Sequence, residues 1–223
     1  RAEEAYDGTG YALAAAGDIN GDGYADLLVT ARFGAGAGNG RAGAGDTYVV
    51  FGRQYFFNPA NLGAIANGFD GFVIRGEDAG DQAGRSVSAA GDVNGDGFDD
   101  LLIGAPYADG DGNTSSQAGD AYVVFGKAGG FDASLDLGVV ASGSGGFAIR
   151  GANAGDRAGF SVAGAGDVNG DGYDDLLIGA RLGDSVGNAR SNAGDSYLVF
   201  GKAGGFGVVN LADIAAGTGG FVI

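Results

Sequence analysis

The sequence has no cysteine, no histidine and no methionine in its 223 residues. Without cysteine, neither a disulfide framework nor thiolate chemistry is available. Without histidine, the chain lacks the side chain that most often serves as a general base or a zinc ligand. These absences exclude large classes of enzymes and metal sites, and we expect the chain to be non-catalytic. Because the first residue is not methionine, we also expect a mature portion or a segment of a longer polypeptide.

Basic residues are scarce, and long hydrophobic runs are missing. The 12 lysines and arginines are outnumbered by 28 aspartates and glutamates, which gives a formal net charge of −16. No basic patch is therefore available to neutralise phosphates, so we expect no binding to nucleic acid or to anionic membranes. No apolar stretch reaches the length of a membrane-spanning helix, so we expect no membrane insertion.

Proline is rare and glycine is abundant, with 2 and 50 residues. The glycines follow no period of three, which excludes collagen. Hydrophobic residues make up 45% of the chain, which is enough for a substantial core. Short apolar runs recur between the glycines, for example at residues 48–51 and 122–125. We therefore expect the glycines to lie in turns between short strands.

The chain repeats itself three times. The stretch at residues 18–26 returns 74 residues later at 92–100, and again 75 residues further on at 167–175. Two other motifs, at residues 45–52 and 71–74, return with nearly the same spacing. Such self-similarity is typical of repeat architectures. We therefore predict a single domain made of three repeats, at residues 1–74, 75–149 and 150–223.

Each repeat is expected to contain four short strands. The second strand is almost continuously aliphatic, which indicates burial on both faces, and the third carries β-branched and aromatic residues. No stretch keeps a helical period over several turns. We predict an all-β chain of three four-stranded antiparallel β-propeller blades, with a β-solenoid of unusually long coils as the alternative. The expected strands are residues 11–17, 26–31, 47–51 and 72–74; 85–91, 100–105, 121–125 and 147–149; and 160–166, 175–180, 196–200 and 221–223.

The nine-residue motif has the composition of a cation-binding loop. Its positions 1, 3, 5 and 9 carry side-chain oxygens, position 7 is placed to offer a backbone carbonyl, and glycines at positions 4 and 6 let the chain curl. Three carboxylates and one amide favour a hard dication, and calcium accepts such flexible oxygen sets more readily than magnesium. We call the three copies loop 1, loop 2 and loop 3. The predicted calcium ligands are Asp18, Asn20, Asp22, Tyr24 and Asp26 in loop 1; Asp92, Asn94, Asp96, Phe98 and Asp100 in loop 2; and Asp167, Asn169, Asp171, Tyr173 and Asp175 in loop 3.

Neither of two other interpretations accounts for the motif. An EF-hand loop needs a glutamate at position 12, where this chain has Val29, Ile103 and Ile178 inside expected strands. Asx-Gly pairs alone make hairpin turns, but a turn does not explain the acids at positions 1 and 9. We therefore expect three calcium sites, one in each repeat.

Residues 84–106 read GRSVSAAGDVNGDGFDDLLIGAP. This run resembles the FG-GAP repeat of integrin α-subunit β-propellers and their bacterial relatives, and the resemblance extends over all three repeats. It implies a propeller blade with calcium held in the hairpin between the first two strands. The literal Gly-Ala-Pro of the motif occurs only at Gly104–Pro106.

The resulting hypothesis is a non-catalytic calcium-binding module that acts in adhesion, matrix or protein–protein interaction. Weak calcium sites of this type suit millimolar calcium, so we expect an extracellular or cell-surface location. A protein or glycan partner would bind the variable connections at residues 33–45, 107–119 and 182–194, unless these loops are merely tolerant of variation. The alternatives are a propeller domain attached to an extracellular enzyme and a repeat unit of an extracellular filament.

Three blades do not close a ring comfortably, because propellers use four to eight. Further blades would come from the same longer chain or from a second copy that completes a six-bladed ring. An open array of repeats is the third possibility.

Overall fold

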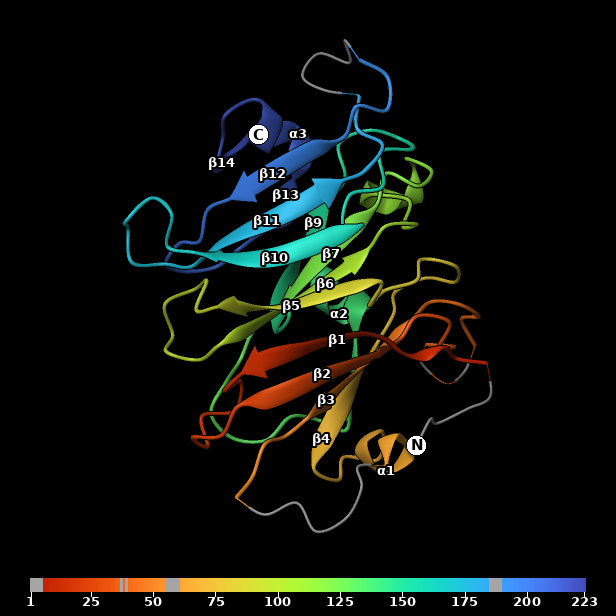
Figure 1. The fold of residues 1–223 in the computed structure, drawn as a ribbon, viewed down its shortest axis with the longest axis vertical. Coiled ribbons are helices and arrows are strands. Elements are labelled where there is room, and N and C mark those ends of the chain that lie inside the picture. The colour runs from red at the N-terminus through yellow and green to blue at the C-terminus, as the bar shows by residue number, and fades with distance from the viewer. Residues whose placement is uncertain (1–5, 37, 39, 55–60, 185–189) are drawn as a thin grey trace.

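The computed structural model describes residues 6–36, 38, 40–54, 61–184 and 190–223. Its strands form three sheets that lie side by side, each built around four antiparallel strands (Figure 1). The first strands of the three sheets are neighbours in space. We call the sheets blades 1 to 3. Blade 1 contains β1 (Thr9–Gly17), β2 (Asp26–Ala31), β3 (Asp46–Val50) and β4 (Gly71–Arg75); blade 2 contains β5 (Ser86–Gly91), β6 (Asp100–Ala105), β7 (Asp120–Val124) and β9 (Gly146–Arg150); blade 3 contains β10 (Ser161–Gly166), β11 (Asp175–Ala180), β12 (Asp195–Val199) and β14 (Gly220–Val222).

The predicted strands are confirmed to within two residues at each end. The second strands, β2, β6 and β11, have the predicted bounds. The third strands begin one residue earlier than predicted, and in blades 1 and 2 the extra residue is an acid with a cross-strand partner. Asp46 pairs with Arg75 at 2.7 Å, and Asp120 pairs with Arg150 at 2.6 Å. A strand pattern based on apolar residues does not include such ion pairs.

The long connections contain short elements that were not predicted. Strands β8 (Ser134–Asp136) and β13 (Val209–Asn210) each add a fifth, parallel strand to the preceding blade, next to β4 and β9. Three one-turn helices follow the third strands, and a short 3₁₀ turn lies at Asp111–Asn113. None of these elements is long enough to show a period in the sequence. The helices are α1 (Leu62–Ile65), α2 (Leu137–Ala141) and α3 (Leu211–Ala215).

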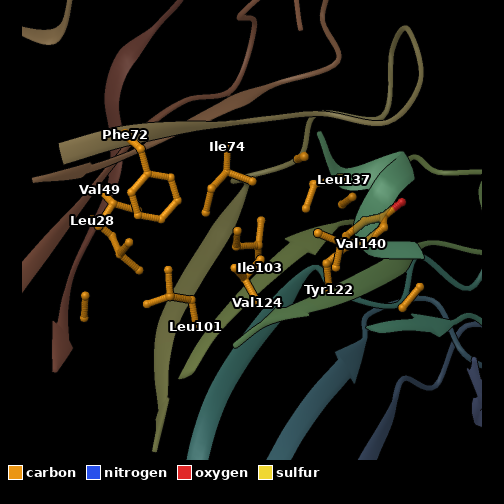
Figure 2. Close-up of a cluster of buried hydrophobic side chains, with 14 of the residues drawn as sticks. Leu28, Val49, Phe72, Ile74, Leu101, Ile103, Tyr122, Val124, Leu137 and Val140 are labelled. Atoms are coloured by element: carbon orange, nitrogen blue, oxygen red, sulfur yellow. The ribbon is translucent and has the colours of Figure 1, made fainter. Parts of the chain in front are cut away.

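Most of the core lies between adjacent blades. Figure 2 shows the cluster between blades 1 and 2, in which Leu28 and Phe72 of blade 1 face Leu101 and Ile103 of blade 2. A second cluster fills the space between blades 2 and 3. Helices α2 and α3 contribute to these two clusters, for example through Val140 of α2. Helix α1 packs instead in a third cluster, against β3 and β4 of blade 1. Each blade is therefore stabilised mainly by its neighbours.

Burial of the second strand on both faces is confirmed for blade 2 and wrong for blades 1 and 3. Successive side chains of a strand point to opposite faces, so Leu101 faces blade 1 and Leu102 faces blade 3. All six residues of β6 are buried. In β2, however, Leu27 is 49% exposed, and in β11 Leu177 is only half-buried. The outer blades lack a neighbouring sheet on one side among the described residues.

In the described part of the chain, no helix has the length and apolar character required to span a bilayer. The repeat boundaries after residues 74 and 149 stay a prediction, as does the number of blades in a closed ring.

Candidate metal centres

Each nine-residue loop connects the first and second strands of a blade. The strand pairing shifts by one residue just before each loop, between Ala15 and Gly17 in blade 1. Gly17 has a φ of 72°, which only glycine adopts without strain. The local sequence therefore turns the chain out of the sheet at the point where the loop begins.

The acid at position 1 organises the loop backbone. In loop 1, Oδ1 of Asp18 accepts the N–H groups of Gly21 and Asp22 at 2.8 and 3.1 Å, and Oδ2 accepts that of Gly23 at 2.8 Å. Asp92 and Asp167 accept the equivalent three bonds in loops 2 and 3. These bonds curl the loop around the carboxylate, so one side chain meets the donors of three residues.

Positions 3 and 5 contact each other. Oδ1 of Asn20 accepts the Asp22 N–H at 2.9 Å, and Nδ2 of Asn20 donates to Oδ2 of Asp22 at 3.1 Å. Oδ1 of Asp22 also accepts the N–H of Tyr24 at 2.9 Å. The same contacts recur in loops 2 and 3. The structure thus brings the predicted ligands at positions 1, 3 and 5 into one exposed turn.

The acid at position 9 has a structural role that the sequence did not predict. Asp26 is fully buried; its Oδ2 accepts the Ile19 N–H at 3.2 Å and its Oδ1 accepts the Gly52 N–H at 2.8 Å. It therefore joins the start of loop 1 to the end of β3. Asp100 and Asp175 make the equivalent bonds. Burial raises the pKa of Asp26 to about 6 and that of Asp100 to about 7, although the backbone N–H groups oppose the shift.

Position 7 carries an aromatic residue whose backbone carbonyl is a predicted calcium ligand. The structure shows no contact that tests the predicted carbonyl ligands of Tyr24, Phe98 and Tyr173. The ring of Phe98 instead covers Gly21 of loop 1, and the ring of Tyr173 covers Gly95 of loop 2. The roles of these three carbonyls stay a prediction.

The residues of the loops fit a hard dication by type of donor. Each loop offers carboxylate and amide oxygens and no nitrogen or sulfur ligand, which is the set that calcium prefers. No ion pair reaches a loop carboxylate in the part of the chain that the structure describes. Within the same residues, no three acidic side chains converge closely enough to hold a metal ion, because the carboxylates point to backbone N–H groups. The chemistry of the donors therefore fits, while the loop geometry is that of a turn closed by its own hydrogen bonds.

Sequence reasoning missed the acid at position 8 of loops 2 and 3. Oδ2 of Asp99 accepts the N–H of Asp18 in the preceding blade at 2.8 Å, and Oδ2 of Asp174 accepts that of Asp92 at 2.8 Å. Loop 1 has Ala25 at this position. The sequence did contain a signal for this contact. Two copies of the motif carry an acid at position 8, although this acid is not among the predicted ligands of its own loop.

A separate acidic group, outside the loops, is balanced by an arginine. Nη1 of Arg150 lies 2.6 Å from Asp120 and 3.1 Å from Glu77, and the hydroxyl of Tyr122 donates to Glu77 at 2.6 Å. Because the guanidinium contacts both carboxylates, it offsets part of their mutual repulsion, and the cluster supports the packing of the sheets.

The chain matches a known family of repeats. A family model described as FG-GAP repeat matches residues 9–50, 83–124 and 158–199. Each matched segment runs from the first strand through the loop to the third strand, so the match covers all three candidate sites.

Several curated proteins are similar to the chain. It is 32% identical to human integrin alpha-7 over 181 residues, which is 80% of this chain and 13% of the relative. It is 33% identical to integrin alpha-PS5 of Drosophila melanogaster over 180 residues, or 79% of this chain and 15% of the relative. Integrin alpha pat-2 of Caenorhabditis briggsae is 35% identical over 108 residues, or 48% of this chain and 8% of the relative. The chain thus spans less than a sixth of the length of these relatives.

Proposed function

The chain belongs to the FG-GAP repeat family and is related to integrin alpha subunits, and from this premise we propose that it is a non-catalytic, calcium-binding propeller module in which one ion stabilises each blade. The observation that carries the proposal is the threefold recurrence of one loop geometry. Positions 1, 3 and 5 come together in the same exposed turn in all three blades.

In each loop the ion would be held by the acids at positions 1, 5 and 9, the amide at position 3 and the carbonyl at position 7. When bound, it supplies positive charge to a turn that holds three carboxylates within nine residues in loop 1 and four in loops 2 and 3. Like charges this close destabilise the turn, and a dication reverses that effect. The residues are Asp18, Asn20, Asp22, Tyr24 and Asp26, with their equivalents in loops 2 and 3.

Calcium binding would make a direct contribution to folding stability. The loop exists only in the folded chain, so the binding free energy adds to the free energy of unfolding. For three sites with dissociation constants of about 1 mM in 10 mM calcium, the total is about 4 kcal/mol. Sites this weak fill only where calcium is plentiful, which supports an extracellular or cell-surface setting.

An adhesive or partner-binding role is proposed for the end of the blades opposite the calcium loops. In an antiparallel sheet, the connection between the second and third strands lies at the other end from the connection between the first and second (Figure 1). These connections, at residues 33–45, 107–119 and 182–194, differ more in sequence among the repeats than the strands do. Residues 37, 39 and 185–189 of them lie outside the described residues. A protein or glycan surface is the kind of partner that such variable loops suit.

Calorimetric titration with calcium tests the proposal. We expect heat of binding at about three sites per chain, and a melting temperature that falls on the order of 10 °C when a chelator replaces 10 mM calcium. Asp22→Asn, Asp96→Asn and Asp171→Asn should each remove one site. Asp213→Asn is the matched control, because Asp213 is an exposed acid of α3 outside the loops.

A chain that binds no calcium and melts at the same temperature in chelator would contradict the proposal. The loops would then be turns closed by their own hydrogen bonds, as the structure depicts them.

A further inference from the structure

Three arginines have no carboxylate partner in a chain that is rich in acids. Four other arginines of the described residues form ion pairs with aspartate or glutamate. Arg32, Arg85 and Arg181 form none within the described ranges, although acids outnumber basic residues by 28 to 12. The side chains of these three arginines contact aromatic rings instead.

Arginine and aromatic side chains alternate across the three blades. The Cζ atoms of Arg32 and Arg85 lie 4.2 and 5.0 Å from the centroid of the Tyr11 ring. The Cζ atoms of Arg85 and Arg181 lie 4.5 and 4.3 Å from the centroid of the Phe160 ring. A guanidinium is attracted to the face of an aromatic ring at such distances. We call the row of Arg32, Tyr11, Arg85, Phe160 and Arg181 the arginine ladder.

The alternation arises from an exchange of residue types in blade 2. The equivalent positions 11, 85 and 160 carry tyrosine, arginine and phenylalanine. The position after the second strand carries Arg32, Pro106 and Arg181. Blade 2 therefore has an arginine where blades 1 and 3 have a ring, and none where they have an arginine. Because β1, β5 and β10 are neighbours (Figure 1), this exchange places Arg85 between the two rings.

The ladder lies at the end of the blades opposite the calcium loops. Tyr11 is near the start of β1, and Arg85 and Phe160 directly precede β5 and β10. Arg32 and Arg181 directly follow β2 and β11. The first strands run from this end toward the nine-residue loops, and the second strands return to it. The ladder therefore shares this end with the variable connections.

The guanidinium groups of the ladder are held in place but are not neutralised. Arg181 is exposed, and Arg32 and Arg85 are partly exposed. The Nε atom of Arg85 is buried and has no hydrogen-bond partner among the described residues. Stacking on a ring engages the face of the guanidinium and leaves its N–H edges available to an acceptor. Three like charges in one row also repel one another, and an anion bound to the row would offset that repulsion.

We propose that the arginine ladder is a docking surface for a carboxylate side chain of a partner protein, with Arg85 as the central contact. The proposal rests on the partner-binding role proposed for this end of the blades. A guanidinium binds a carboxylate through two parallel N–H···O bonds. The rings of Tyr11 and Phe160 beside it offer contact to apolar side chains next to the acid.

The net charge of the chain favours a partner with few charges of its own. The formal charge of −16 repels a densely charged polyanion such as a sulfated glycan. At physiological ionic strength the screening length is about 8 Å, so a single carboxylate on the ladder is affected mainly by the nearest arginines. The partner is therefore expected to present an isolated acid among apolar residues.

An NMR titration with a blocked pentapeptide, which has one glutamate between two phenylalanines, tests the proposal. At physiological ionic strength with calcium, we expect saturable shifts of the Arg85 Nε–H signal. The peptide with glutamine in place of glutamate should bind at least about tenfold more weakly. Arg85→Gln should weaken binding of the glutamate peptide by at least about tenfold as well.

Two further variants separate recognition from folding and from net charge. Arg85→Lys keeps the charge and loses the planar fork, so its affinity should lie between those of the native chain and Arg85→Gln. Arg53→Gln is the matched control, because it removes the same charge from an arginine that is paired with Asp70 at 2.7 Å and lies beyond the other end of β3. It should leave the affinity unchanged. Melting temperatures at fixed calcium concentration show that each variant is folded.

Four outcomes would overturn the proposal. They are no binding of the glutamate peptide, equal affinity for the two peptides, unchanged affinity in folded Arg85→Gln, and tighter binding of a heparin disaccharide than of the glutamate peptide. The last would make a sulfated glycan the occupant. Calcium binding is measured separately by calorimetry, and a partner held by the variable connections alone would still bind Arg85→Gln. Failure of the ladder is therefore distinguishable from failure of the proposed function.

Discussion

Blades 2 and 3 contain the same hexapeptide in their second strands, yet it is buried differently. β6 and β11 both read Asp-Leu-Leu-Ile-Gly-Ala. All six residues are buried in β6, whereas the third and fifth residues of β11, Leu177 and Gly179, are only half-buried. These two residues share one face of the strand because side chains alternate. Burial in this protein is thus decided by the neighbouring sheet and not by the local sequence.

Loops 2 and 3 show the same dependence of burial on a neighbouring blade. Loops 2 and 3 differ in one residue, Phe98 against Tyr173. Val93 of loop 2 is fully buried beneath blade 3, while Val168 of loop 3 is 55% exposed. Nearly identical loops therefore contribute differently to stability, depending on whether a further blade covers them.

Truncation of the central leucine should reveal the largest difference between the two blades. Leu102→Ala removes a side chain that is fully buried between blades 2 and 3, and we expect a loss of about 2–5 kcal/mol in the free energy of unfolding. Leu177→Ala, the same change in blade 3, should cost about 1 kcal/mol or less. Urea denaturation at fixed calcium concentration measures both. Equal losses would mean that the face of Leu177 is covered in solution.

Removal of the hydrogen bond between position 8 of loop 3 and the start of loop 2 should have a smaller effect. Asp174→Ala leaves the N–H of Asp92 without its acceptor, and we expect a loss of about 1–3 kcal/mol in the free energy of unfolding. The change makes loop 2 resemble the uncovered loop 3. Ala25→Asp in monomeric protein is the matched comparison, because its new acid has no preceding blade to contact, and it should change stability by less than about 0.5 kcal/mol. If Asp174→Ala left the free energy of unfolding unchanged, this hydrogen bond would make no contribution to stability.

The smallest expected effect is a pH dependence of the free energy of unfolding that differs between blades 2 and 3. It arises in the turns that precede β5 and β10. Asp81 and Asp156 occupy equivalent turns, and burial raises the pKa of each. The pKa of Asp81 reaches about 7, with the carboxylates of Asp78, Asp120 and Glu77 adding to the shift. Asp156 has Asn153, which donates a hydrogen bond at 3.1 Å, where Asp81 has Asp78.

The sign of the effect follows from the raised pKa. The folded chain holds a proton on Asp81 that the unfolded chain releases at lower pH, so this contribution to stability is complete below about pH 4 and is lost as pH rises to about 7. Asp78→Asn introduces the asparagine of blade 3 and should reduce this loss by about 1 kcal/mol for each unit by which it lowers the pKa of Asp81. Denaturation curves between pH 5 and 8, with Asp213→Asn as control, measure it. An unchanged pH profile would show that Asp78 has no part in the shift.

Much of the fold was predictable because the same pattern of residues occurs three times in the chain. The bounds of β2, β6 and β11 follow directly from aliphatic runs that begin at the last loop acid. The helices α1 to α3 and the strands β8 and β13 were missed, because elements of two to five residues show no period and form only against a neighbouring blade. The loops themselves were found from the spacing of Asp and Asn, and in the structure positions 1, 3 and 5 lie in one exposed turn. Their calcium stays a prediction.

The sequence by itself determined the repeat, the strand order within a blade and the chemistry of each loop, since these depend on residues close together in the chain. Only the tertiary structure decided which of three nearly identical faces are covered. It also assigned Asp99 and Asp174 to the preceding blade, about 80 residues away along the chain. The physical reason is that burial and the hydrogen bonds between blades depend on a second sheet, whose position no local pattern encodes.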